Sequence, residues 1–201
     1  MAKSKKIRVG ILFGGKSAEH EVSLRSAKNI LDALDKEKYD VALIGIDKLG
    51  RWQLREFPSL AGDKKQSLLP EITGRSVILV PESSGSLSST DGKDGGGKID
   101  VVFPILHGPF GEDGTVQGLL KLANVPFVGA GVLGSAVGMD KEIMKRLLRE
   151  AGIPVTKFIV LKAEEKIPSF EIIKKQLGLP FFIKPANLGS SVGVSKIKSK
   201  K

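Results

Sequence analysis

Short apolar runs that suit buried strands alternate with amphipathic segments along this chain of 201 residues. Residues 7–13 are mostly apolar and end at a Gly-Gly pair, and residues 22–34 then place most of their apolar side chains on one helical side. Further strand-like runs occupy residues 41–46, 76–80 and 101–106. This alternation predicts an α/β fold whose core is an open, mainly parallel sheet.

Two segments between these runs have a different character. Gly50, Trp52 and Leu54 suggest a hairpin strand that continues from residues 41–46, consistent with a position at the sheet edge. Residues 83–98 hold five serines, five glycines and one large apolar side chain, Leu87. That composition predicts a mobile surface loop that contributes nothing to a core.

Glycines loosen the chain at residues 129–138, and the pattern changes beyond them. We therefore expect one domain at residues 1–133 and the start of a second at 134–201. In the second, Asp140 and Ser169 are in position to cap two helices. The expected elements are helices at 141–151 and 170–177, and strands at 158–161, 181–184 and 194–197.

Composition excludes several classes of protein. Seven lysines near the two ends supply most of the net charge of +10, which indicates solvated tails and not a nucleic-acid-binding face. No apolar run approaches the roughly 20 residues that cross a bilayer. The absence of cysteine excludes disulfides and thiolate sites and fits a cytoplasmic protein.

A loop rich in polar residues follows the first strand. Residues 10–17 formally match the phosphate-loop pattern, but residues 11–13 are the strand itself, so too few remain to wrap a phosphate. A strand, a Gly-Gly turn and a helix still form a good anion or carboxylate site. Glu19 and Glu21 lie here, and their charge alone could simply complement the dipole of the next helix.

Residues 107–118 are the most informative segment of the chain. Glycines, His107 and the two acids Glu112 and Asp113 lie between a buried strand and an amphipathic helix at 115–123. Open α/β sheets bind ligands at the carboxyl ends of their strands, where His107 is expected. The two acids would also cap the helix without any catalytic role.

A lysine and a small-residue loop form a second motif near the carboxyl end. Lys184 ends a strand, and residues 189–193 read Gly-Ser-Ser-Val-Gly. A lysine can meet phosphates as a point charge, and loop amides can fold over them. Lys141 opens a helix against the dipole, which calls for a reason beyond helix formation.

The segments at 14–23, 107–118 and 182–194 resemble the signatures of the D-alanine–D-alanine ligases, members of the ATP-grasp superfamily, and the resemblance covers residues 7–197. It implies ATP-dependent joining of two D-alanines through an acyl phosphate, for peptidoglycan synthesis in the cytoplasm. It also implies a homodimer, with no nucleic-acid or membrane partner, and Mg²⁺ or Mn²⁺ beside ATP.

The resemblance also assigns roles to residues. The acid matching Glu19 receives the amino group of the first D-alanine, and the histidine matching His107 lies at the substrate carboxylate and amine. Ser23 is expected to bind substrate, and Ser190 to share a hydrogen-bond chain with Glu19. The expected catalytic residues are thus Glu19, Ser190 and His107, and the expected nucleotide-binding residues are Lys141, Lys184, Ser190, Ser191 and Val192.

The family's metal ligands, transition-state arginine and substrate flap match nothing in these 201 residues, so we expect the chain alone to be inactive and to hold no metal site.

Three alternatives to a D-alanine–D-alanine ligase stay open. A D-alanine–D-lactate ligase or another ATP-grasp carboxylate ligase would share much of the pattern, and a fragment that only binds ligand would share it too. A Rossmann dehydrogenase is disfavoured because no G-x-G-x-x-G follows the first strand.

Overall fold

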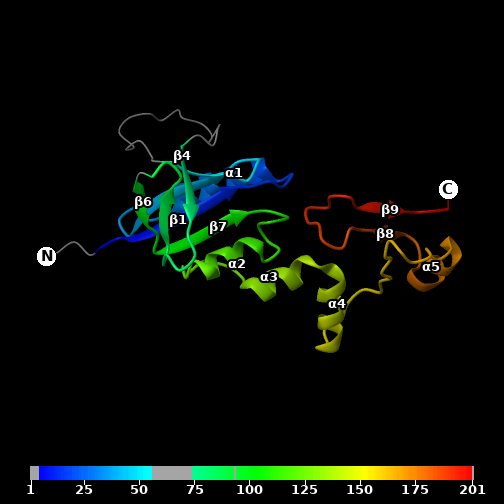
Figure 1. The fold of residues 1–201 in the computed structure, drawn as a ribbon. Helices are drawn as coiled ribbons and strands as arrows, with labels where there is room; N and C mark the ends of the chain where they lie inside the picture. Colours follow the sequence, from blue (N-terminus) through cyan, green and yellow to red (C-terminus); the bar gives the residue numbers. More distant parts are fainter. Residues whose placement is uncertain (1–4, 56–73, 93, 201) are drawn as a thin grey trace. The chain divides into compact units, whose positions relative to one another are not determined.

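The computed structural model describes residues 5–55, 74–92 and 94–200. Its chain forms two compact units, Met1–Ala136 and Val137–Lys201 (Figure 1). The division falls within helix α3 (Val132–Met139), in the glycine-rich segment where the sequence predicted a domain boundary but no helix.

In the described part of the first unit, the strands form one sheet in the order β6-β5-β4-β3-β2-β1-β7. Its parallel part consists of β1, with β2 on one side and β7 on the other. The remaining neighbours, from β2 to β6, pair antiparallel. The strands are β1 (Ile7–Gly14), β2 (Tyr39–Ile46), β3 (Trp52–Arg55), β4 (Arg75–Leu79), β5 (Ser86–Ser89), β6 (Asp94–Lys98) and β7 (Val101–Leu106). The predicted α/β class is confirmed, and the antiparallel strands extend its parallel centre.

Helices cover both faces of the parallel strands. Alternate side chains of β1 point to opposite faces, so Ile11 and Leu12 lie in different buried clusters. Helix α1 (His20–Ala33) packs on the Ile11 face through Ala27, and α2 (Thr115–Leu122) packs on the Leu12 face through Leu120. Both predicted helices are confirmed, although α1 begins two residues earlier than expected.

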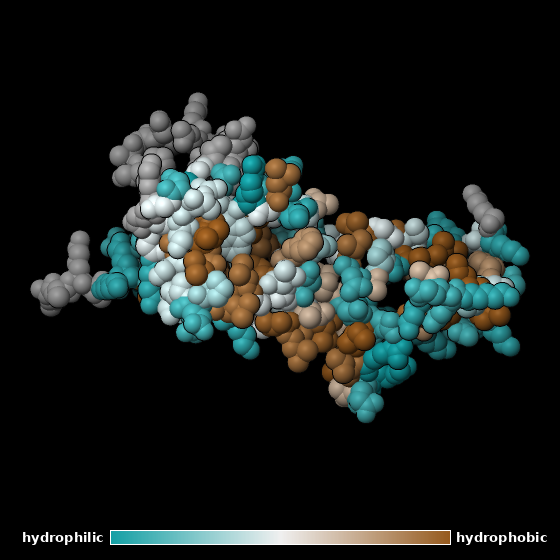
Figure 2. Space-filling view, in the orientation of Figure 1, coloured by the Kyte–Doolittle hydropathy of each residue, from teal (hydrophilic) through white to brown (hydrophobic). Residues whose placement is uncertain are grey.

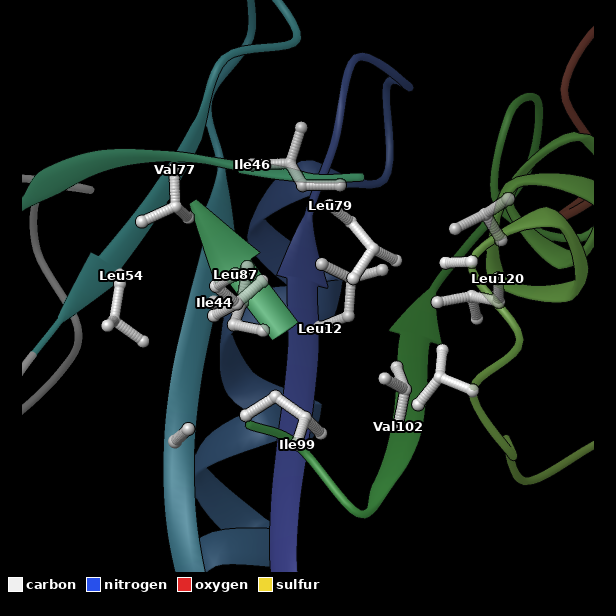
Figure 3. Close-up of a cluster of buried hydrophobic side chains, with 14 of the residues drawn as sticks. Leu12, Ile44, Ile46, Leu54, Val77, Leu79, Leu87, Ile99, Val102 and Leu120 are labelled. Atoms are coloured by element: carbon white, nitrogen blue, oxygen red, sulfur yellow. The ribbon is translucent and has the colours of Figure 1, made fainter. Parts of the chain in front are cut away.

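The prediction of a coreless loop at residues 83–98 is wrong. These residues form β5 and β6, and Leu87 is buried in the same cluster as Leu12 and Ile44 (Figure 3). The glycines permit close packing: a Cβ on Gly95 would lie 1.9 Å from the carbonyl oxygen of Leu87. Contrary to the expectation from the sequence, the hairpin strand β3 does not lie at the edge of the sheet, because it pairs with β2 on one side and with β4 on the other.

The second unit contains α4 (Lys141–Glu150), α5 (Phe170–Leu177) and a hairpin of β8 (Phe181–Ile183) with β9 (Ser195–Ile197). The predicted caps are confirmed: Asp140 accepts hydrogen bonds from the amides of Glu142 and Ile143, and Ser169 accepts one from Ile172. The strand predicted at 158–161 is wrong, because those residues have no sheet partner among the described residues.

Apolar side chains of the second unit remain largely exposed. Helices α4 and α5 bury no residue completely, and Leu147 and Phe182 are each about half exposed. Figure 2 shows such side chains in brown on the visible surface. Across the described residues, no helix combines the length and the apolar character that a membrane crossing requires.

Candidate functional site

Two loops meet where β1 and β7 end. Because these strands are parallel neighbours, with Gly14 opposite Leu106, the segments that follow them leave the same edge of the sheet. Ser23 ties the two strand ends together: its hydroxyl accepts a 2.8 Å hydrogen bond from the Gly14 amide and donates one to the Ile105 carbonyl. The residue is fully buried, so it fixes the spacing of the two loops.

Glu19 comes from the first loop and reaches the second. Its Oε2 lies 2.9 Å from the position that a Cβ would take on Gly108, where φ is 72°. A side chain at residue 108 would therefore be strained and would force the carboxylate to move. The Glu19 amide donates a 3.1 Å hydrogen bond to the Ser17 hydroxyl.

His107 begins the second loop, immediately after β7. Its Nε2 lies 3.3 Å from the hydroxyl of Ser26 on α1, a contact that orients the ring. The structure thus brings His107 and Glu19 to adjoining loops of the first unit. Ser23 lies below them as a buried link, and its predicted direct contact with substrate stays a prediction.

The two acids of the second loop hold the loop's own backbone. Glu112 accepts a 2.7 Å hydrogen bond from the Gly108 amide, and Asp113 accepts from the amides of Phe110 and Thr115 at 2.9 and 3.0 Å. Partial burial opposes ionisation of Asp113, but these hydrogen bonds outweigh it and hold its pKa below the ordinary value. The hydrogen bonds that Glu112 and Asp113 accept from loop amides explain why acidic residues stand at these two positions.

A cavity of about 180 Å³ lies between the two loops and β3. His107 and Ser17 line it, together with the apolar side chains of Ile46, Trp52 and Leu119. At its rim, Lys16 Nζ lies 5.3 Å from the centroid of the Phe110 ring. Sequence reasoning missed Lys16, Trp52 and Phe110. Only Phe110, an aromatic residue in a glycine-rich loop, gave a local signal.

In the second unit, Lys141 is attached to the segment that leads into the small-residue loop. Its amide donates to the Ala186 carbonyl at 3.1 Å, and its Nζ donates to the carbonyls of Ala186 and Leu188. Asn187 adds a 3.2 Å hydrogen bond to the Asp140 carboxylate. Hydrogen bonds from the Ile143 amide, from Asn187 and from the Glu142 amide lower the pKa of Asp140, although partial desolvation opposes them.

Residues 189–193 form a tight turn within the connection from β8 to β9. Ser190, Ser191 and Gly193 have φ values of 47°, 61° and 70°. The Val192 amide closes a turn onto the Gly189 carbonyl, and a Cβ on Gly193 would meet Pro185 at 2.8 Å. Lys184 follows β8 directly, with its Nζ 5.7 Å from the Phe182 ring.

Two other sequence interpretations can be compared with the structure. The formal phosphate-loop pattern starts inside β1, which runs through Gly14, so its rejection is confirmed. Within residues 5–55, 74–92 and 94–200, no group of three histidine, cysteine or acidic side chains could hold a metal ion. The Mg²⁺ or Mn²⁺ implied by the resemblance stays a prediction.

Comparison with known proteins places both units in one family. Residues 8–130 match the family model of the D-ala D-ala ligase N-terminus, and residues 147–201 match that of the C-terminus. The D-alanine–D-alanine ligase A of Chromobacterium violaceum is 55% identical over 198 residues, and the ligase of Shouchella clausii is 53% identical over 195. These matches cover 96% and 95% of this chain and 54% and 53% of the relatives.

Solved structures of ligases of the same family also match this chain. The D-alanine-D-alanine ligase from Coxiella burnetii has a TM-score of 0.84 at 38% identity, covering 96% of this chain and 57% of that one. The VanG D-Ala:D-Ser ligase from Enterococcus faecalis has a TM-score of 0.78 at 33% identity, covering 98% and 57%. The chain spans about half the length of the curated relatives it matches. The fold, the loops at the β1–β7 edge and these matches together show that the chain belongs to the D-alanine–D-alanine ligase family.

Proposed function

We propose that this chain serves the ATP-dependent joining of two D-alanines into D-alanyl-D-alanine, for peptidoglycan synthesis. The observation that carries the proposal is the position of the Glu19 carboxylate beside Gly108, the residue that follows His107, at an edge where α/β sheets bind ligands. The names of the relatives supply the substrate class.

The first unit would bind the first D-alanine. Its ammonium group calls for an anionic partner, and Glu19 offers a carboxylate that lies beside Gly108, while the Glu19 amide is bonded to the Ser17 hydroxyl. His107, oriented by Ser26, would contact the substrate's polar end as donor or acceptor, according to its tautomer. Ser23 would keep the two loops in register.

The second unit would bind ATP, and its residues fit that ligand. Ser190 and Ser191 place backbone amides in a tight turn, closed by the Val192 amide, that can cover phosphate oxygens, and Lys184 adds a cation next to it. Lys141 would act partly by holding the 186–188 segment that leads into the turn. Bound ATP supplies the phosphoryl group that activates the first D-alanine carboxylate as an acyl phosphate. Accompanying Mg²⁺ or Mn²⁺ would offset phosphate charge.

A second candidate differs in the second substrate. The likeness to a structure named as a D-Ala:D-Ser ligase favours testing other second substrates, including D-serine and D-lactate. All these reactions share the activation of a first D-alanine, so the roles of Glu19 and Lys184 would be the same. The homodimer and the cytoplasmic location stay predictions.

The test is D-alanine-dependent ADP release with ATP and Mg²⁺, and the products are identified by mass. We expect no product from the 201-residue chain and recovery when the carboxyl-terminal half of a close relative is appended. In the active, extended chain, Glu19→Gln should lower kcat/KM for D-alanine about 100-fold, because an ammonium loses its charged partner.

The matched control is Glu21→Gln, two residues away. Glu21 is exposed and pairs with Lys48 at 3.2 Å, so its loss should change kcat/KM less than about twofold, as for an exposed ion pair. Equal effects of the two substitutions would contradict the proposed ammonium site. Product with D-serine or D-lactate alone would favour the second candidate.

A further inference from the structure

One face of the β8–β9 hairpin carries two lysines around one aromatic ring. Phe182 and Lys196 are directly paired across the antiparallel strands, so their side chains share a face. Lys184, two residues beyond Phe182, continues on the same side. The Nζ atoms of Lys184 and Lys196 each lie 5.7 Å from the centroid of the Phe182 ring.

The electrostatic setting of this pair is unusual. Residues 179–200 contain no aspartate or glutamate, and neither lysine forms a salt bridge with any residue that the structure describes. The two lysine ammonium groups beside one ring repel each other, and the attraction of each to the ring offsets only part of this repulsion at an exposed site. A bound polyanion would attract both ammonium groups and outweigh the repulsion between them.

The same hairpin also carries a turn suited to anions. Lys184 is followed by the 189–193 turn, where Ser190, Ser191 and Gly193 all have positive φ. Turn amides and two lysine side chains thus belong to one short hairpin, since the turn lies in the connection between β8 and β9. A single phosphate would need only one lysine, whereas a chain of phosphates could contact both.

We propose that Lys196 is a second phosphate-binding lysine of the nucleotide site and works with Lys184 across the face of Phe182. The inference rests on the proposed ATP site of the second unit and adds a residue to it. Lys196 would contact ATP directly, and Phe182 would hold both lysine stems in place.

The experiment is a ¹H–¹⁵N titration of the 201-residue chain with ATP that follows the amide signals of residues 189–193. We expect Lys196→Met to weaken ATP binding about tenfold, the loss of one charge-assisted contact. Lys196→Arg should keep most of the affinity. Lys198→Met is the matched control: it removes the same charge just after β9, two residues from Lys196, where the structure shows no lysine–ring contact with Phe182, and it should change affinity less than about twofold.

The titration separates this inference from the proposed function. If Lys184→Met weakens ATP binding while Lys196→Met behaves like Lys198→Met, Lys196 only packs on the ring and the inference is wrong. If the amide signals of residues 189–193 in the unsubstituted chain do not respond to ATP, or if Lys184→Met leaves the ATP affinity unchanged, both the proposed ATP site and this inference are wrong. A further arm with AMP should show a smaller loss for Lys196→Met than ATP does, and an equal loss would overturn the assignment to the phosphate chain.

Discussion

Replacing Ser23 by alanine should destabilise the first unit more than any other single hydroxyl loss in the candidate site. Its hydroxyl is fully buried, accepts from the Gly14 amide at 2.8 Å and donates to the Ile105 carbonyl. Alanine removes both hydrogen bonds and leaves the Gly14 amide and the Ile105 carbonyl without this partner. Losing a partner of a buried polar group costs about 1–3 kcal/mol, so the free energy of unfolding should fall by about 2–4 kcal/mol.

Urea unfolding followed by tryptophan fluorescence measures this loss. Trp52 is the single tryptophan of the sequence and packs against the core of the first unit, so its signal reports that unit alone. The midpoint should fall while the slope with urea stays unchanged. Ser88→Ala, on the exposed side of β5, serves as the control and should change stability by less than about 0.5 kcal/mol. A Ser23→Ala loss as small as that of the control would refute the idea that this hydroxyl joins the strand ends.

Two further predictions concern a glycine and a carboxylate of the first unit. Gly95→Ala should cost about 2–4 kcal/mol in the same urea assay, because the new Cβ meets the Leu87 backbone. Gly92→Ala, at φ 75° with no atom within 4 Å, should cost only the roughly 1 kcal/mol of backbone strain, and equal losses would contradict the packing argument. Asp113 has a lowered folded-state pKa, so it contributes stability above its unfolded pKa of about 4 that is lost as pH falls through the lowered folded value. Unfolding measured across acidic pH should therefore depend less on pH in Asp113→Asn, and parallel curves would argue against the effect.

Local signals predicted much of the fold. The apolar run at 7–13, the amphipathic segment at 22–34 and the caps Asp140 and Ser169 all correspond to observed elements. In each case the strand or helix is determined by side chains close in sequence. His107 at the end of β7 could also be placed, because a buried apolar run and a glycine-rich loop bracket it.

Other elements depend on contacts distant in sequence. The polar composition of residues 83–98 concealed β5 and β6, because one buried leucine and closely packed glycines are enough to add a hairpin to an existing sheet. The apolar residues 158–161 suggested a strand, but a strand requires a partner. The cavity beside His107 could not be predicted either, since Trp52 and Phe110 meet there only through the sheet and the 107–114 loop.

Strands β1 and β7 are direct neighbours in the sheet, although β2 to β6 lie between them in the sequence. The candidate site at their carboxyl ends therefore does not depend on the path of that intervening segment. The antiparallel strands β3 to β6 are added at the far side of β2, and the chain returns to β7 at the opposite end of the strands from the two loops. Changes in the length of the connections between β3 and β6 would therefore alter the outer edge of the sheet but not the spacing of Glu19 and His107. The outer strands and the spacing of these two side chains are therefore structurally independent of each other.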